Sequence, residues 1–312
     1  EAEGGALTAG TYTASNPGMN GQVTVEVVTD DSSIVSVEVT ENQETPGIGS
    51  PLVDGVKEGT IPTLSIPAAI VENQTVAVDA VAGATITSAA VKSAVEDCLT
   101  QAGANMDDWK TPVEKAAAEE IEMAADVVVV GGGGAGLAAA ISASQNGAKV
   151  IVIEKNGAVG GDTLVCGAIY NNPDEALQGK VEMSDAVKKT LEAGIAVDPV
   201  DDAHKELINT VSEEWKQHQA DGKTTLFDSD AWFTLQTYNG GDNVADLDLV
   251  KVLCDNAVEG YEWIKGLGME CNDTIGQGAG ALWQRTHTST KPMGTGFIST
   301  YVENIAKDDN IE

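Results

Sequence analysis

The hydroxyl group of Thr85 lies in a segment whose composition suits a phosphate ester. Residues 79–88 read Asp-Ala-Val-Ala-Gly-Ala-Thr-Ile-Thr-Ser, so a glycine and an alanine leave the backbone uncrowded before the threonine. Residues 89–95 follow with helical apolar spacing, and we expect Thr87 and Ser88 to supply N-cap hydroxyls for a helix. Exposed N–H groups and the positive end of a helix dipole favour a phosphate there. The alternative interpretation is an ordinary capped turn between a strand and a helix.

A second segment carries glycines at a spacing that suits a dinucleotide. Residues 126–140 contain a run of valines, a Gly-x-Gly-x-x-Gly turn and a run of small residues. Gly131, Gly133 and Gly136 permit a tight turn, let the backbone approach a pyrophosphate, and allow a helix to pack closely on a strand. A second apolar strand ends at Glu154, whose carboxylate is placed to accept hydrogen bonds from a ribose. The pattern predicts a buried strand, a turn, a helix and a second strand around a nucleotide.

The Thr85 segment resembles a known family of FMN-binding domains. About thirty residues upstream, residues 44–49 read Glu-Thr-Pro-Gly-Ile-Gly, which is similar to a second motif of the same family. The two motifs stand in the family's order. The resemblance implies FMN attached covalently through its phosphate to Thr85, and a flavin transferase as the protein that attaches it.

The second half resembles the flavoprotein subunits of fumarate reductases and succinate dehydrogenases, especially soluble reductases of unsaturated acids. FAD and NAD share the glycine turn, so the choice of FAD rests on residues 160–168, 248–269 and 285–296, which follow the family's order of segments. The FAD-binding residues that the turn and the resemblance together imply are Gly131, Gly133, Gly134, Ala135, Gly136, Glu154, Lys155, Gly160, Gly161, Thr163 and Ala168.

The sequence predicts an α+β FMN-binding domain followed by an α/β Rossmann-like FAD-binding domain that is incomplete. The first domain is expected over residues 1–105, a short helical linker over 106–123, and the N-terminal part of the FAD domain over 124–312. Alternating apolar residues predict strands over 21–28 and 34–39, and residues 176–270 are expected to be largely helical. The resemblance places the family's proton donor and substrate-binding residues beyond residue 312. We therefore expect a fragment of a longer protein, with no catalytic residue in this chain.

The composition excludes some partners. Seventeen basic and 49 acidic residues give a net charge of −32, which argues against binding of nucleic acid or anionic lipid. No uninterrupted apolar run of about 18 residues could span a membrane. Glu1–Gly5 would suit the start of a mature chain, so we expect an extracytoplasmic protein.

The cysteines and histidines indicate no metal site. The cysteines lack a C-x-x-C pair or the spacing of zinc or iron–sulfur sites, and we expect them to be small buried hydrophobic residues. We expect His204 and His218 on the surface of an amphipathic segment, and a structural hydrogen-bonding role for His287. The four cysteines are Cys98, Cys166, Cys254 and Cys271.

These observations predict a flavin reductase. Electrons from an external donor would reach FMN on Thr85, pass to FAD, and reduce an activated carbon–carbon double bond, as in fumarate or urocanate. Its partners would be the flavin transferase, the electron donor and a small-molecule acceptor. The protein would meet a membrane only peripherally, through a donor protein. Three alternatives stay open: a flavin dehydrogenase that works in the oxidative direction, an electron-transfer module without a substrate site, and a binding domain whose Thr85 is never modified.

Overall fold

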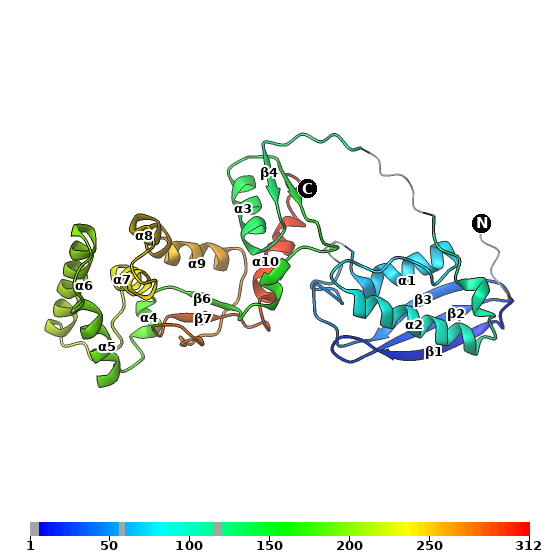
Figure 1. The fold of residues 1–312 in the computed structure, drawn as a ribbon, viewed down its shortest axis with the longest axis horizontal. Coiled ribbons are helices and arrows are strands. Elements are labelled where there is room, and N and C mark those ends of the chain that lie inside the picture. The colour runs from blue at the N-terminus through cyan, green and yellow to red at the C-terminus, as the bar shows by residue number, and fades with distance from the viewer. Residues whose placement is uncertain (1–5, 56–59, 115–119) are drawn as a thin grey trace. The chain divides into compact units, whose positions relative to one another are not determined.

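The computed structural model describes residues 6–55, 60–114 and 120–312 (Figure 1). The chain divides into two compact units, one made of Glu1–Val165 with Phe297–Glu312 and the other of Cys166–Gly296. Our expectation of a helical linker over 106–123 falls partly on residues 115–119, which lie outside the described residues. In the described part of that linker, only the short 3-10 helix η1 (Met106–Trp109) is helical.

The first unit begins with an antiparallel sheet and two helices. The strands are β1 (Gly10–Pro17), β2 (Gln22–Thr29) and β3 (Ile34–Glu41), in the order β1-β2-β3. The helices are α1 (Pro62–Asn73) and α2 (Thr85–Gln101). β2, β3 and α2 confirm the two strands and the helix that the sequence predicts, and the arrangement is α+β as expected.

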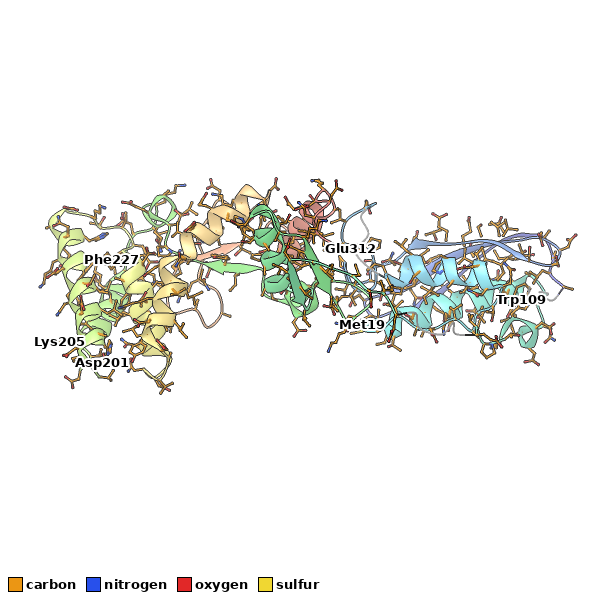
Figure 2. The ribbon with its side chains drawn as sticks, turned by 90° about the horizontal axis from the view of Figure 1, so that it is seen from above. Met19, Trp109, Asp201, Lys205, Phe227 and Glu312 are labelled. Atoms are coloured by element: carbon orange, nitrogen blue, oxygen red, sulfur yellow. The ribbon has the colours of Figure 1, made fainter. Side chains whose placement is uncertain are left out.

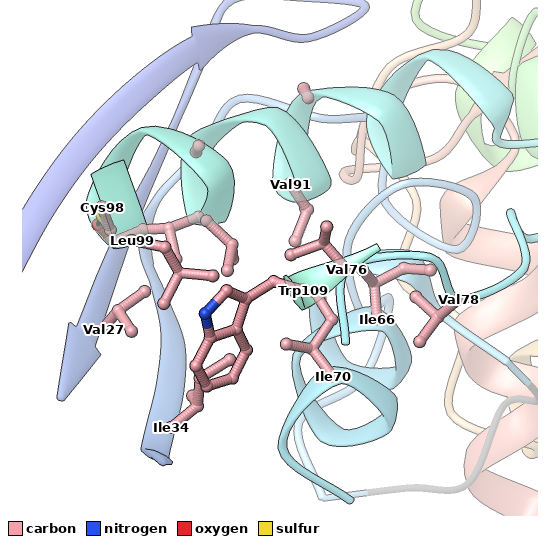
Figure 3. Close-up of a cluster of buried hydrophobic side chains, with 14 of the residues drawn as sticks. Val27, Ile34, Ile66, Ile70, Val76, Val78, Val91, Cys98, Leu99 and Trp109 are labelled. Atoms are coloured by element: carbon pink, nitrogen blue, oxygen red, sulfur yellow. Dashed lines mark hydrogen bonds between the residues drawn. The ribbon is translucent and has the colours of Figure 1, made fainter. Parts of the chain in front are cut away.

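The core of this domain lies between the sheet and its helices. Val23, Val25 and Val27 are fully buried, because alternate residues of a strand point to the same face. Apolar residues of α2, including Val91 and Leu99, belong to the same buried cluster (Figure 3).

Trp109, the last residue of η1, packs into this core. Its side chain is fully buried beside Ile34, Ile70 and Leu99 (Figure 3), and its backbone oxygen accepts a 2.9 Å hydrogen bond from the Val76 N–H group. The packing of the first domain therefore extends past the boundary predicted at residue 105.

The first unit also contains the predicted strand, turn, helix and strand. β4 (Val127–Val130) pairs in parallel with β5 (Val150–Ile153), and α3 (Gly134–Gln145) connects them. The helix α10 (Thr295–Ile305) precedes residues 310–312. These residues pair with β5, and the Val150 N–H group donates a 2.8 Å hydrogen bond to the Asn310 backbone oxygen.

The exposure of β4 differs from the prediction of a buried strand. The side chains of Val128 and Val130 are 54% and 83% exposed. Within the described residues β4 pairs with β5 alone, so its apolar side chains have few neighbours to pack against.

The second unit, Cys166–Gly296, is mostly helical, as predicted for residues 176–270. Its two short strands pair in antiparallel fashion. The elements are β6 (Ile169–Asn171), α4 (Glu175–Gln178), α5 (Asp185–Ile195), α6 (Asp202–Ala220), α7 (Asp230–Gly240), α8 (Leu247–Asp255), α9 (Ala257–Gly266) and β7 (Thr286–Thr288). No helix among the described residues is long and apolar enough to cross a membrane.

Acidic and hydroxyl side chains begin most helices of this unit. At α6, the Asp201 side chain accepts a 2.8 Å hydrogen bond from the His204 N–H group, and the Lys205 N–H group bonds to the Asp201 backbone oxygen. Figure 2 labels Asp201 and Lys205. These caps satisfy N–H groups that lack a partner within the helix. The capping residues of α4 to α8 are Asp174, Ser184, Asp201, Ser229 and Asp246.

Replacing Trp109 should test the extended core. Trp109→Ala should lower the free energy of unfolding of the first domain by about 3–5 kcal/mol, because it leaves a large cavity. The indole N–H group has no hydrogen-bond partner among the described residues, so Trp109→Phe should cost only about 1–2 kcal/mol. Urea unfolding followed by circular dichroism measures both. The control is Met19→Ala, because Met19 is 63% exposed (Figure 2); equal losses in all three variants would contradict the packing.

Candidate flavin sites

Thr85 is the first residue of α2, and its side chain is exposed. The N-cap residue is Ala84, and no described side chain caps this helix. Gly83 has a φ of +82°, and beyond its chain neighbours no described atom lies within 4 Å of where a Cβ would be. The turn therefore presents the Thr85 hydroxyl to solvent beside N–H groups of the first helical turn that have no intrahelical partner.

Thr87 and Ser88 are not the N-cap residues that the sequence predicts. The helix begins earlier, so both lie inside its first turns and are buried, with 3% and 0% exposure. The Ser88 hydroxyl donates to the Ala84 backbone oxygen at 2.9 Å and accepts from the Val81 N–H group at 3.0 Å. These bonds fix the turn from its buried side and leave the side that carries Thr85 exposed.

Glu44 is the partner of Thr87. Its side chain is 4% exposed, and one carboxylate oxygen accepts a hydrogen bond from the Thr87 hydroxyl. The other accepts a 3.1 Å hydrogen bond from the Asn20 N–H group. The motif at residues 44–49 indicated the family, but nothing in its pattern predicts this contact of the Glu44 side chain.

The predicted FAD residues of the first unit come together around the glycine turn. Gly131 has a φ of +103°, which favours glycine. The Gly160 N–H group donates to the Gly132 backbone oxygen at 2.7 Å, and the Gly134 N–H group donates to the Thr163 hydroxyl at 3.2 Å. Hydrogen bonds thus join the glycine turn to a segment about thirty residues later in the chain.

Gly136 shows why the turn needs small residues. A Cβ at this position would overlap the Gly131 backbone oxygen. The N-cap residue of α3 is Gly133, which has no side chain, and the first N–H group of the helix, that of Gly134, is the one that bonds to the Thr163 hydroxyl. A close-fitting glycine turn at a helix start suits a pyrophosphate.

Glu154 binds the glycine turn itself. Its carboxylate accepts hydrogen bonds of 2.8 Å from the N–H groups of Asn156 and Gly132. The Asn156 N–H group holds the pKa of Glu154 below its ordinary value, and the Gly132 N–H group adds to this effect. The predicted contact with a ribose would use the lone pairs that remain.

The remaining predicted FAD residues have varied surroundings. Ala135 and Lys155 are exposed, and Gly161 is half-buried with a φ of +50°. Ala168 belongs to the second unit, where it is buried with a φ of +60°, and its backbone oxygen accepts a 3.0 Å hydrogen bond from the Ser289 N–H group.

Residues 285–287 form the polar centre of the second unit. Arg285 and Asp228 make a buried ion pair of 2.7 Å, and the same guanidinium donates to the Gln236 side chain at 2.8 Å. His287 is fully buried with its Nε2 atom 3.2 Å from the Asp174 carboxylate, in line with a structural role. Asp228 carried no sequence signal, since it lies 57 residues from its partner.

The prediction for the other histidines was wrong. His204 is fully buried, and its Nδ1 atom accepts a 3.3 Å hydrogen bond from the Val200 N–H group. His218 is half-buried and stacks on the Trp215 ring at 5.5 Å. On α6, His204 precedes buried Leu207 by three residues, so its place on the apolar stripe could have been foreseen.

The cysteines match the prediction only in part. Cys98 and Cys254 are buried, and burial raises the pKa of the Cys98 thiol to about 11. Cys166 is exposed, contrary to the prediction, and Cys271 is half-buried. Across the described ranges, no group of three or more Cys, His, Asp or Glu side chains is arranged to hold a metal ion.

Gly136→Ala should weaken FAD binding. The added Cβ forces the turn apart, and overpacking of this kind costs about 1–3 kcal/mol, so we expect the FAD affinity to fall about 10-fold to 100-fold. Isothermal titration with FAD measures the change. The control is Gly266→Ala, where a Cβ would meet no described atom within 4 Å. Unchanged affinity in Gly136→Ala would contradict the proposed pyrophosphate position.

Acid should loosen the turn through Glu154. Because its pKa is lowered on folding from the ordinary 4.5, its stabilisation is present above pH 4.5 and is lost as the pH falls through the lowered pKa. The difference in unfolding free energy between wild type and Glu154→Gln should therefore be constant from pH 7 to pH 5 and shrink towards pH 3. The exposed Glu122→Gln serves as the control. A difference that grows on acidification would contradict this account.

Comparison with known proteins identifies the two segments. Residues 18–100 match the family described as FMN-binding domain, and residues 126–222 match the family described as FAD binding domain. Both matches agree with the folds described above, and they cover the Thr85 turn and the glycine turn.

The chain is similar to several reductases. It is 30% identical to the NADH:acrylate oxidoreductase of Vibrio harveyi over 97% of this chain and 31% of that protein. It is 33% identical to the urocanate reductase of Eggerthella lenta over 81% of this chain and 33% of that protein. The structure of the open conformation of a flavocytochrome c3 fumarate reductase matches over 60% of this chain and 26% of that protein's chain. The two are 24% identical there, with a TM-score of 0.41.

The chain spans about a third of the length of these two curated relatives. Within that span it contains both cofactor-binding segments. The chain thus contains one segment that matches FMN-binding domains and one that matches FAD binding domains, and it is similar to reductases of acrylate, urocanate and fumarate.

Proposed function

We propose that this chain is the flavin-carrying part of a reductase that reduces the carbon–carbon double bond of a small unsaturated organic acid. Electrons from an external donor reach FMN held covalently on Thr85, pass to FAD at the glycine turn, and then reach the acid. The observation that carries the proposal is the presence, in one chain, of an exposed acceptor hydroxyl and an open dinucleotide turn.

The Thr85 turn supports covalent attachment. In the attachment step the Thr85 hydroxyl oxygen bonds to the flavin-side phosphorus of FAD while the pyrophosphate bond breaks. Adenosine monophosphate leaves, and the hydroxyl proton passes to the flavin transferase. The open backbone at Gly83 and the free N–H groups at the start of α2 suit the resulting phosphate ester.

The glycine turn supports FAD as the second cofactor. The N–H groups at the start of α3 would bind the pyrophosphate, Glu154 would orient the ribose, and Thr163 would lie under the flavin. Bound flavins supply one- and two-electron chemistry, and the protein contributes binding and orientation.

The relatives support the proposed substrate class. Acrylate, urocanate and fumarate, the acids in their names, share a double bond activated by a conjugated carbonyl group, and these three are the acceptors to test first. Reduction adds a hydride from the flavin and a proton from a protein group.

A covalent flavin suits a protein outside the cytoplasm, where a lost cofactor is not replaced. We therefore propose an extracytoplasmic location, with an electron-donating protein that can bring the chain to a membrane surface. The net charge of −32 would favour a basic donor over a nucleic acid or an anionic lipid.

Removal of one hydroxyl group separates the two cofactors. Thr85→Ala should abolish the FMN-sized mass increment after co-expression with a flavin transferase, while FAD still binds. Intact-protein and peptide mass spectrometry measure the first, and isothermal titration with FAD measures the second. The control is Thr100→Ala, near the other end of α2, which should keep the increment. Loss of both cofactors in Thr85→Ala would contradict two separate sites.

Turnover assays distinguish the alternatives. Reduction of an unsaturated acid by a reduced donor dye supports the reductase. Turnover only with an oxidised acceptor and a saturated acid indicates a dehydrogenase. Reduction of both flavins without turnover of any acid indicates an electron-transfer module.

A further inference from the structure

We propose that Glu44 is a positioning residue for the attachment of FMN to Thr85. This inference rests on the proposed function, because it assumes that Thr85 is the acceptor. Glu44 holds the first turn of α2 in the conformation in which the Thr85 hydroxyl faces the transferase and its flavin nucleotide.

The contacts of Glu44 join three separated segments. Its carboxylate accepts from the Thr87 hydroxyl, 43 residues later, and from the Asn20 N–H group, 24 residues earlier. The side chain is 4% exposed, so solvent competes little for either bond. Movement of the Thr85 turn away from the sheet would break the bond to Thr87.

The direction of the contact excludes a role for Glu44 as the base. Thr85 and Thr87 are two residues apart on α2, which places their side chains about 200° apart around the helix axis. Thr87 is 3% exposed, whereas Thr85 is exposed. Glu44 therefore lies on the buried side of the helix, away from the reacting oxygen, and acts on Thr85 through the backbone.

The surroundings of Glu44 are shaped around its carboxylate. A Cβ on Gly49 would lie 2.7 Å from the Glu44 Cβ atom and 2.9 Å from the Thr87 hydroxyl oxygen, closer than real Cβ atoms approach. A Cβ on Gly18 would collide with the carboxylate. The two glycines leave room for this hydrogen-bonded group and for little else.

A structural role alone explains Glu44 poorly. Burial of a carboxylate carries a desolvation cost, and an apolar residue in its place is often neutral or stabilising for a fold. The sheet and helices around it already share a large apolar core. What the carboxylate adds is a fixed direction for the turn, and a misplacement of about 1 Å can slow a reaction about 100-fold.

The test is the rate of flavin attachment to the full chain. Wild type, Glu44→Ala, Thr87→Val and Glu44→Gln are incubated with purified flavin transferase and FAD, and the mass increment is followed over time at several chain concentrations. The control is Glu41→Ala, an exposed carboxylate three residues away. Urea unfolding of each variant gives its folded fraction, so that every rate is expressed per folded molecule.

We expect kcat for attachment to fall at least about tenfold in Glu44→Ala and Thr87→Val, with KM for the chain nearly unchanged. Glu44→Gln keeps one acceptor for the Thr87 hydroxyl and should recover most of the rate. Because both single changes break the same bond, Glu44→Ala with Thr87→Val should be no slower than the slower single variant. The control should react as wild type.

Three results would overturn the inference. These are wild-type kcat per folded molecule in Glu44→Ala and Thr87→Val, a loss confined to KM, and a Glu44→Gln variant as slow as Glu44→Ala, which would point to charge instead of position. If Glu44→Ala does not fold, Thr87→Val and Glu44→Gln decide the question. Failure of the proposed function is distinguishable, because wild type itself would then gain no increment.

Discussion

Both candidate flavin sites depend on one constraint: a helix must begin with backbone N–H groups that no side chain of its own covers. α2 begins after Ala84 and α3 after Gly133, and neither N-cap residue has a side chain that bonds to its helix. At α3 the Thr163 hydroxyl, from a later segment, accepts from the first N–H group. The helices α4 to α8 begin instead with Asp or Ser side chains that bond to their first N–H groups. A capping oxygen and a phosphate oxygen would compete for the same donors. At α2 the chain therefore forgoes a cap worth about 1 kcal/mol.

Without an N-cap side chain, the turn before each helix must be fixed by other hydrogen bonds. The chain provides them on the buried side of the turn. At α2 the support comes from Glu44 through Thr87, and from Ser88 through the backbone of the preceding turn. At α3 it comes from Glu154 and Thr163, which accept from the N–H groups of the glycine turn. In both turns, hydrogen-bond acceptors of the protein fix the backbone from the protein side, and the opposite side of the turn stays accessible to a ligand. The two sites share this arrangement although their folds differ.

The sequence predicted the parts of this arrangement that repeat with a regular period. Alternating valines predicted β2, the valine run with its glycines predicted β4 and α3, and two motifs indicated Thr85 as the acceptor. Contacts between distant segments were missed, because neither the bond from Thr87 to Glu44 nor the pair of Arg285 with Asp228 leaves a local pattern. The error at Thr87 has the same cause: a hydroxyl at a helix start can cap the helix or turn inward, and packing decides which.

The continuity of the first domain has a consequence for the order of events during synthesis. Its buried cluster uses only residues 7–109, whereas the dinucleotide fold requires residues near the far end, since Val150 bonds to Asn310 and Ser144 to Asp308. At roughly 5–20 residues per second, the ribosome needs about 10–40 s to translate the roughly 200 residues in between. The Thr85 domain can thus be a finished fold while the glycine turn still lacks its last neighbour. A nascent chain would thus complete its two candidate flavin sites one after the other.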